Sequence, residues 1–169
     1  MNRAVRWPVA VVAKTGILGG GRVRTEEGVY RIRQAADGWY SILGRTPASG
    51  RVRYNGARDI LEIERPGVSL SIQFRSELEK TAFELDRTVY DVATMDFGRI
   101  SIRERGRSVV EGRVTPSGVR LESVAPDLQP IERELAFGLA LRSNEVARGF
   151  RQADRAGDGW TMPPPPPIR

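Results

Sequence analysis

The feature that most constrains this chain is a short apolar run near its end, residues 135–141 with the sequence LAFGLAL. About a hundred residues of short, alternating apolar and polar sequence precede it. A helix that is apolar on every side leaves no face for water and has to be covered, and the preceding strands are the available cover. The sequence therefore predicts an all-β fold, a closed antiparallel β-barrel around one buried hydrophobic C-terminal helix.

Alternation with period two marks the strands, because successive side chains of a strand point to opposite faces. The clearest example places apolar side chains at positions 68, 70, 72 and 74 with polar ones between them. Turn signals lie at Asp37-Gly38, Asn55-Gly56 and Pro66-Gly67, and Asn-Gly is the strongest short hairpin signal. The other strands are expected at residues 29–33, 39–43, 51–54, 60–65, 82–86, 89–94, 99–104, 108–115 and 119–124. Turn signals at this spacing indicate a sandwich or a barrel.

One segment carries helix signals. Asp127 is expected to cap the helix, Pro130 is tolerated in its first turn, and helical character is expected to persist to about Phe150. Five consecutive prolines at 163–167 can continue neither helix nor sheet. The predicted organisation is an N-terminal strand or arm with a glycine-rich loop (1–21), a β-barrel with its C-terminal helix (22–150) and a disordered proline-rich tail (151–169). Such a tail is also a candidate contact for a partner domain.

The N-terminal apolar run, residues 7–13, follows Arg3 and Arg6 and has the outline of a signal peptide. Lys14 ends this run at the lower limit of length, so a buried strand is the favoured interpretation. No stretch reaches the ~18 apolar residues that a membrane-spanning helix needs. We therefore expect a cytoplasmic protein without a transmembrane segment, able to act at the periphery of a membrane.

The chain contains neither cysteine nor histidine. Their absence excludes thiolate metal sites, disulfides and most catalytic triads, because the commonest metal ligand and general base are missing. Asp91 and Asp96 flank an apolar stretch, but on a strand and turn they need not converge. A hydrolase that uses carboxylates stays an alternative. The sequence itself predicts no catalytic residue, no metal site and no cofactor, and hence a protein that is not an enzyme.

Positive charge is concentrated in the first third of the chain. The whole sequence has a formal net charge of +6, whereas residues 1–55 hold ten basic and three acidic side chains, a net charge of +7. Such asymmetry points to an anionic partner. Arg-x-Arg pairs recur in this part, and residues two apart share one face of a strand. The candidate ligand-binding residues are Arg22, Arg24, Arg31, Arg33, Arg51 and Arg53.

The partner that guanidinium pairs fit best bears phosphate, and acidic lipid headgroups of an anionic membrane surface are the first choice. An ordinary solvated face, with arginine favoured by codon usage, is the plainer alternative. A nucleic-acid-binding β-barrel is another, because Trp39, Tyr40, Tyr54 and Phe74 could stack on bases. A structural or interaction domain with no small ligand is the last.

Two segments resemble the tubby-like superfamily, which comprises the tubby C-terminal domain, the LURP-one-related proteins and the phospholipid scramblases. One is Tyr90-Asp91-Val92 followed by residues 97–106, FGRISIRERG. The other is PDLQP at 126–130, which leads into the apolar run. The resemblance implies a closed barrel around a hydrophobic C-terminal helix, and contact with membrane lipids or phosphoinositides. It assigns no headgroup site, and the cysteine-rich and membrane segments of scramblases have no counterpart in this sequence. The main rival is a pleckstrin-homology-like barrel, with about seven strands instead of about twelve.

Overall fold

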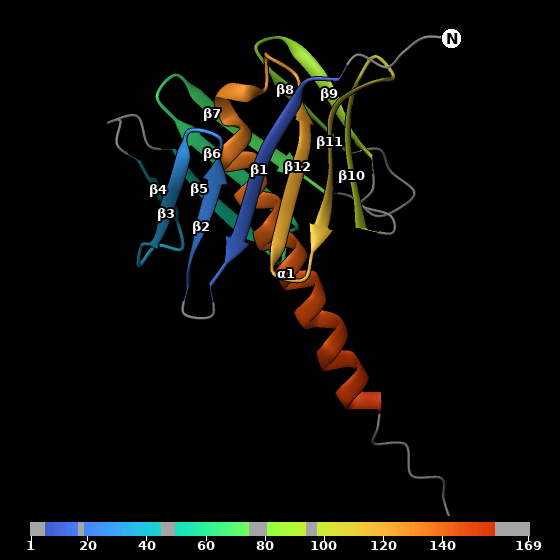
Figure 1. Cartoon of the computed structure of the whole chain (residues 1–169). Coiled ribbons are helices and arrows are strands. Elements are labelled where there is room, and N and C mark those ends of the chain that lie inside the picture. The colour runs from blue at the N-terminus through green and yellow to red at the C-terminus, as the bar shows by residue number, and fades with distance from the viewer. Residues whose placement is uncertain (1–5, 17–18, 45–49, 75–80, 94–97, 158–169) are drawn as a thin grey trace, which may run out of the picture.

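The structure is a computed structural model of the chain and describes residues 6–16, 19–44, 50–74, 81–93 and 98–157 (Figure 1). Twelve strands and one long helix account for most of these residues. The strands are β1 (Pro8–Thr15), β2 (Gly20–Thr25), β3 (Gly28–Gln34), β4 (Tyr40–Leu43), β5 (Arg51–Asn55), β6 (Ile60–Arg65), β7 (Val68–Gln73), β8 (Thr81–Leu85), β9 (Thr88–Ala93), β10 (Arg99–Glu104), β11 (Arg107–Thr115) and β12 (Gly118–Val124). A 3-10 turn, η2 (Gln129–Ile131), leads into α1 (Glu132–Gly157).

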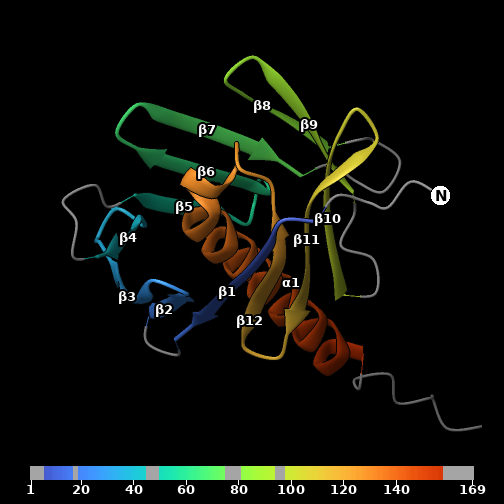
Figure 2. The same cartoon turned by 45° about the horizontal axis from the view of Figure 1, so that its top comes forward.

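The twelve strands form one sheet that curves into a nearly closed barrel (Figure 2). Their order is β7-β6-β5-β4-β3-β2-β1-β12-β11-β10-β9-β8. Each hydrogen-bonded pair is antiparallel, as short hairpin connections allow. The edge strands β7 and β8 lie next to each other, which brings the two edges of the sheet together. The structure therefore confirms the predicted antiparallel strands, the nearly closed barrel and the C-terminal helix.

The alternating side chains fill the barrel, as the period-two pattern predicts. Leu61 and Ile63 on β6 have no exposed surface, whereas Glu62 and Glu64 between them are half-buried on the outer face. The run expected as a strand at 7–13 is β1, which lies between β2 and β12 at the centre of the sheet. Burying one face of every strand against the interior is what specifies the pairing register.

The barrel has two ends, which are defined here by the orientation of Figure 1. The upper end holds the β2–β3 and β6–β7 turns and the start of α1. The lower end holds the end of β1, the start of β2 and the β3–β4 and β5–β6 turns, and α1 leaves the barrel there. The chain therefore returns from the last strand at the upper end and runs back along the barrel as a helix.

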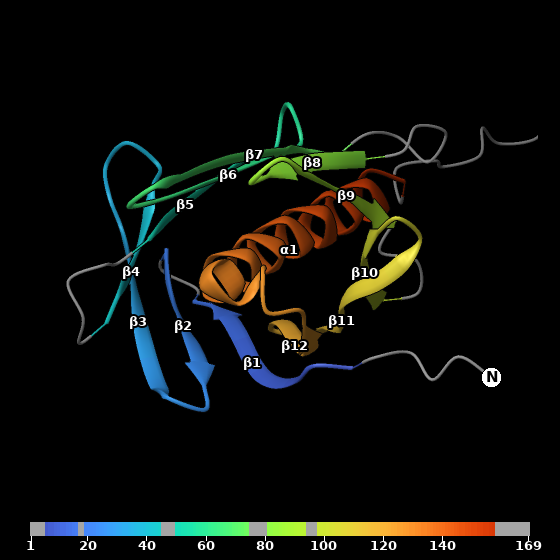
Figure 3. The ribbon, with the colours of Figure 1, turned by 90° about the horizontal axis from the view of Figure 1, so that it is seen from above.

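The first turns of α1 are buried, and its second half extends beyond the ends of the strands (Figure 1). Leu135, Phe137 and Ala140 have no exposed surface. The helix contacts β1, β2, β5, β6 and β12, and Figure 3 shows it within the curve of the sheet. From Glu145 onward the described side chains are exposed. The apolar run predicts this division, because polar residues follow it directly.

One stripe of α1 faces strand β6 at three successive turns. Arg65 Nη1 lies 4.0 Å from Glu134 Oε2 near the upper end. One turn on, a Cβ at Gly138 would overlap the Leu61 side chain. A further turn on, Arg142 binds the Asp59 carboxylate with two hydrogen bonds of 2.8 and 3.0 Å. The helix supplies the acid in the first ion pair and the base in the second. A helix that ran in the opposite direction would place like charges together, so the two pairs favour the observed direction.

Three local predictions differ from the structure. The helix is not capped by Asp127: Leu128 occupies the cap position of η2 without a side-chain hydrogen bond, because the 3-10 turn starts one residue later. The helix continues to Gly157 instead of ending near Phe150, since residues 151–156 contain neither glycine nor proline.

The Asn55-Gly56 signal does not form a two-residue hairpin. The β5–β6 turn is longer: Asn55 Oδ1 accepts a hydrogen bond from the Arg58 N–H at 3.2 Å. The left-handed conformation falls on Asp59, with φ of 52°, and not on the glycine. The side chain of Asn55 therefore competes with the tight turn by capping backbone groups locally.

Candidate functional site: a basic face on strands β1 to β3

Three cationic residues lie directly opposite one another on three adjacent strands. Lys14 on β1 is the Cα partner of Arg22 on β2, and Arg22 is the Cα partner of Arg31 on β3. Arg24 and Arg33 extend this row along β2 and β3, and both are exposed. On the other side, Arg120 of β12 pairs with Val12, which pairs with Arg24. We call this surface the basic face: Lys14, Arg22, Arg24, Arg31, Arg33 and Arg120.

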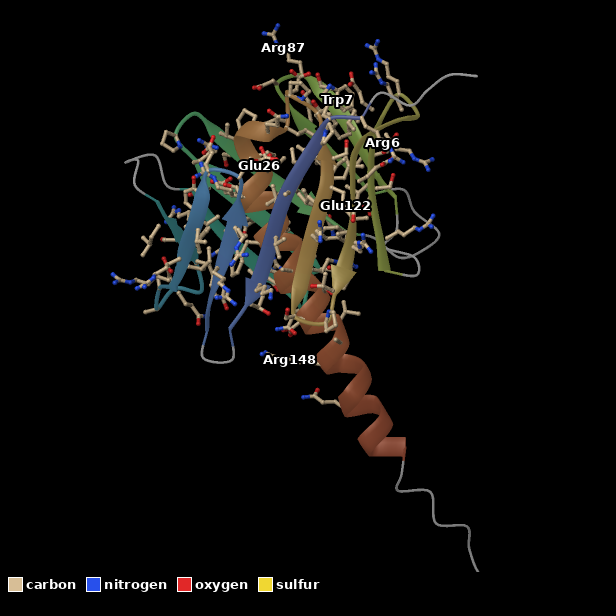
Figure 4. All side chains as sticks on the ribbon, viewed as in Figure 1. Arg6, Trp7, Glu26, Arg87, Glu122 and Arg148 are labelled. Carbon is tan, nitrogen blue, oxygen red and sulfur yellow. The ribbon has the colours of Figure 1, made fainter. Side chains whose placement is uncertain are left out.

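The basic face is not neutralised by neighbouring acids. None of its six cations makes an ion pair with another residue in the part of the chain that the structure describes. The closest acids in sequence, Glu26 and Glu27, lie in the β2–β3 turn at the upper end, where Figure 4 shows Glu26. Like charges placed directly opposite across strands destabilise a sheet. The repulsion between these cations therefore lowers the free energy of unfolding, and no ion pair with another described residue offsets it.

Arg51 and Arg53 differ from the other four predicted arginines. Each faces an acid across the β5–β6 pair: Arg51 Nη2 lies 2.5 Å from Glu64, and Arg53 Nε lies 2.7 Å from Glu62. Their guanidinium groups also lie over the Trp39 ring, 4.4 and 4.7 Å from its centroid. The hydrogen bond that Arg53 donates to Glu62 raises the pKa of Arg53. These two arginines belong to a neutral network that covers Trp39.

Two members of the basic face, Lys14 and Arg120, are absent from the sequence prediction. Lys14 directly follows an apolar run, so in the sequence it only marks the end of that run. Arg120 lies between two apolar residues, about a hundred positions after Lys14. Only the pairing of β1 with both β2 and β12 brings them beside the arginine pairs. The alternation of residues 11–14 does indicate that Lys14 points outward, opposite to Ala13.

A second group of arginines lies on strands β10 to β12, in line with Arg120. Arg99 is the Cα partner of Arg113, which is the partner of Arg120. Here acids are interspersed: Arg113 hydrogen-bonds Glu122, and Arg6 lies 3.9 Å from Glu111 (Figure 4). These side chains border an outer hollow of about 700 Å³. The region is mixed in charge and is less suited to an anionic partner than the basic face.

Exposed apolar side chains stand at the border of the basic face. Leu43 on β4 is the Cα partner of Arg31 and is 40% exposed. Val29 on β3 is the Cα partner of Arg24 and is 57% exposed. Arg31, Arg33 and Leu43 also line a shallow depression of about 680 Å³. The rows through Arg31 and Arg24 thus end at an apolar residue that faces solvent.

Of the four aromatic residues that could stack on bases, Trp39 and Phe74 are covered, and Tyr40 and Tyr54 are half-buried at the lower end of the barrel, away from the basic face. Trp39 lies beneath Arg51 and Arg53, and Phe74 beneath Arg142, whose guanidinium is 4.2 Å from the ring centroid. Tyr40 packs edge-on against Phe137 with ring centroids 5.5 Å apart. The Tyr54 hydroxyl donates a hydrogen bond of 2.6 Å to Asp59. None of the four presents an open ring face to the basic face.

The described residues contain no group of three or more acidic side chains that could hold a metal ion. Asp91 lies on β9, while Asp96 falls outside the described residues. Among the helices of the described part of the chain, none is both long and apolar enough to cross a membrane. The proline-rich segment at 163–167 also lies outside the described residues.

Comparison of the chain with family models, with curated proteins and with solved structures finds no match.

Proposed function

We propose that this protein is a non-enzymatic module that binds anionic surfaces through the basic face, with acidic lipid headgroups as its first partner. The carrying observation is the row Lys14–Arg22–Arg31, three cations directly opposite one another without a described acid to pair them. The same sheet pairs Arg51 with Glu64 and Arg53 with Glu62 elsewhere. Like-charged neighbours on β1 to β3 are best explained by an anionic partner from outside.

Lipid is favoured over nucleic acid by the apolar residues at the border. Basic residues near an anionic membrane contribute ~1 kcal/mol each, and exposed apolar side chains such as Leu43 and Val29 can enter the headgroup region. A protein that binds single-stranded nucleic acid would instead need open aromatic faces beside the basic residues. Trp39 and Phe74 are covered, and Tyr40 and Tyr54 lie at the lower end of the barrel instead of on the basic face. Binding at the periphery of a membrane, on its cytoplasmic side, follows from this proposal.

We also propose that the barrel encloses α1 and that the chain is a distant member of the tubby-like superfamily. Leu135 and Phe137 project from opposite sides of the helix and are both fully buried, which supports cover on all sides. Twelve strands match the tubby-like expectation better than the seven of a pleckstrin-homology-like barrel. The family resemblance is consistent with lipid contact. It does not assign the residues of the basic face, which follow from the strand register of this chain.

The test is co-sedimentation with vesicles of phosphatidylcholine that contain phosphatidylserine, over a series of salt concentrations. We expect binding that falls steeply with salt, because exposed charges are screened within ~8–10 Å at physiological ionic strength. Reversing Arg31 and Arg33 to Glu should weaken binding by at least about thirtyfold, the loss of ~2 kcal/mol from two cations.

The matched control reverses Arg87 and Arg105 to Glu, which changes the net charge equally. Both lie in turns on the β8–β11 side of the barrel, and both have positive φ in the parent protein. Little change in vesicle binding is expected for this control. Equal loss from the two double variants would contradict a defined face, and tighter binding to duplex or single-stranded DNA than to vesicles would favour nucleic acid.

A further inference from the structure

A polar cleft lies at the lower end of the barrel, between α1 and the rim of strands β1 to β5. Its volume is about 280 Å³, close to the lower end of the range for small-molecule sites. Its lining includes Gln34, Tyr40, Tyr54, Leu141, Glu145 and Arg148. Figure 4 shows Arg148 on α1 where the helix leaves the barrel.

The walls of this cleft are held in place by contacts between α1 and two hairpins. Asn144 Nδ2 donates a hydrogen bond of 2.9 Å to Thr15 Oγ1 at the end of β1. The next residue, Glu145, lies against Gly56 in the β5–β6 turn, where an added Cβ would come 3.1 Å from its Cγ. The cleft is therefore formed in the folded chain and does not depend on a ligand to shape it.

Four polar side chains of the cleft are available to a ligand. Gln34, Glu145 and Arg148 are exposed to solvent and Tyr40 is half-buried. None of the four side chains has a hydrogen bond or ion pair to another described residue, although Glu145 and Arg148 lie one helical turn apart. Burial raises the pKa of Tyr40, while Arg148 lowers it and Glu145 raises it. The charges of Arg148 and Glu145 therefore both act on the Tyr40 hydroxyl.

The Gln34 amide occupies space beside the cleft that the lack of a side chain at Gly19 leaves free. A Cβ at Gly19 would overlap the Gln34 amide, and Gly19 has a φ of 76°, which favours glycine in any case. The amide therefore depends on Gly19 for its place at the rim. Tyr40 and Tyr54 supply ring surface, and Leu141 adds an apolar side chain.

We propose that this cleft binds a single sugar ring. One carboxylate and one guanidinium balance each other, so the site is matched to a neutral ligand, and a bound phosphate would face Glu145. A carboxylate accepts, a guanidinium donates, and an amide and a hydroxyl do both, which suits vicinal hydroxyl groups. The tyrosine rings and Leu141 suit the C–H face of a sugar, whereas a purely apolar ligand would displace water from the polar groups without replacing its hydrogen bonds.

The sugar has two sources that share this chemistry. The cleft and the depression beside Arg31 and Arg33 share Gly19, Gly20 and Gln34. A glycolipid headgroup could therefore enter the cleft while the basic face contacts a membrane, or a free sugar could enter from solution. The inference itself goes beyond the proposed function and does not require that the basic face binds lipid.

The test is an NMR titration of the isotope-labelled full chain with methyl glucoside, methyl galactoside and methyl mannoside, with glycerol as the non-ring control. We expect saturable shifts at Gln34, Tyr40 and Glu145 with at least one glycoside. Tyr40→Phe should weaken binding about three- to tenfold, and Glu145→Gln about tenfold or more, in line with a neutral and a charged hydrogen bond. The matched control is Tyr30→Phe, the same change at the upper end.

Vesicles with and without galactosyldiacylglycerol distinguish the two sources of the sugar. Retention of the protein only on the glycolipid vesicles would identify a lipid headgroup as the ligand. Binding of the free glycoside without such retention would identify a soluble sugar. The Arg31→Glu/Arg33→Glu variant should still bind the free glycoside, so failure of lipid binding leaves this inference separately testable. Shifts no larger than those with glycerol, or shifts outside the cleft, would overturn it. Equal weakening by Tyr40→Phe and Tyr30→Phe would do the same.

Discussion

Asp59 is the most fully partnered acid at the lower end of the barrel. Its carboxylate accepts two hydrogen bonds from Arg142 and one from Tyr54. Burial alone would raise the pKa of Asp59, but these hydrogen bonds and the charge of Arg142 outweigh it and hold the pKa below its usual value. The pKa of Tyr54 is raised, first by burial and then by its bond to Asp59. Glu134 at the other end of the same stripe is fully buried, and neither of its oxygens has a hydrogen-bond partner.

Asp59→Asn should destabilise the protein by about 1–2 kcal/mol at neutral pH, because Arg142 loses a charged acceptor that is partly exposed. Asparagine tolerates the left-handed backbone of this position, so the change isolates the charge. A carboxyl with a lowered folded-state pKa contributes stability above its unfolded pKa of about 3.9 and loses it as pH falls through the folded value.

The parent protein and Asp59→Asn should therefore converge in stability as pH is lowered through this range. Urea unfolding at neutral pH and at successively lower pH measures the difference directly. A gap that stays constant, or widens towards acid pH, would show that the Asp59 charge does not stabilise the native state.

At the scale of elements, the packing of α1 on β6 depends on a glycine. Gly138 lies between Glu134 and Arg142 on the stripe that faces β6, and Leu61 fills the space where a Cβ would be. Leu61 has no exposed surface, so it cannot move aside freely. Gly149 lies on the part of the same helix that extends beyond the strands, and a Cβ there would meet nothing within 4 Å.

The same substitution at these two positions should have opposite effects. Gly138→Ala is expected to cost about 1–3 kcal/mol through overpacking against Leu61. Gly149→Ala should stabilise the protein by about 0.5–1 kcal/mol, because alanine is the better helix former. Chemical denaturation of both variants checks this, and a neutral or stabilising Gly138→Ala would refute the close approach of α1 to β6.

The strands could be predicted from the sequence, often with their ends, whereas the start and end of the helix and the form of the β5–β6 turn could not. Alternation at 60–65 and 68–74 predicts strands because one face of each is buried in the barrel. The helix start and the β5–β6 turn differ from what the sequence predicts. Leu128 occupies the cap position instead of Asp127, and the Asn55 side chain caps its own turn. Which of two local conformations forms is decided by tertiary packing, which a local sequence signal does not contain.

At the scale of the whole molecule, the sequence could predict an excess of positive charge but not which cations remain unpaired. Arg22 and Arg51 look alike in sequence, each within an Arg-x-Arg pair. The sheet register then places Arg22 opposite Lys14 and Arg31, and Arg51 opposite Glu64. The distinction is a property of pairing across strands, and it separates the basic face from the network over Trp39.

The location of the binding face can be measured with single-cysteine variants, because the chain has no native cysteine. Leu43→Cys places a polarity-sensitive dye beside Arg31 at the border of the basic face. Val89→Cys is the matched control: Val89 is 55% exposed, and its strand β9 is far from β4 in the sheet order. The dye reports directly whether its position enters a less polar environment.

The account predicts a blue shift of the dye at position 43, and none at position 89, when vesicles containing phosphatidylserine are added at low salt. The shift should disappear as salt is raised, and vesicles of phosphatidylcholine alone should not produce it. Equal shifts at the two positions, or a shift at position 89 only, would contradict the claim that strands β1 to β3 carry the membrane-binding face.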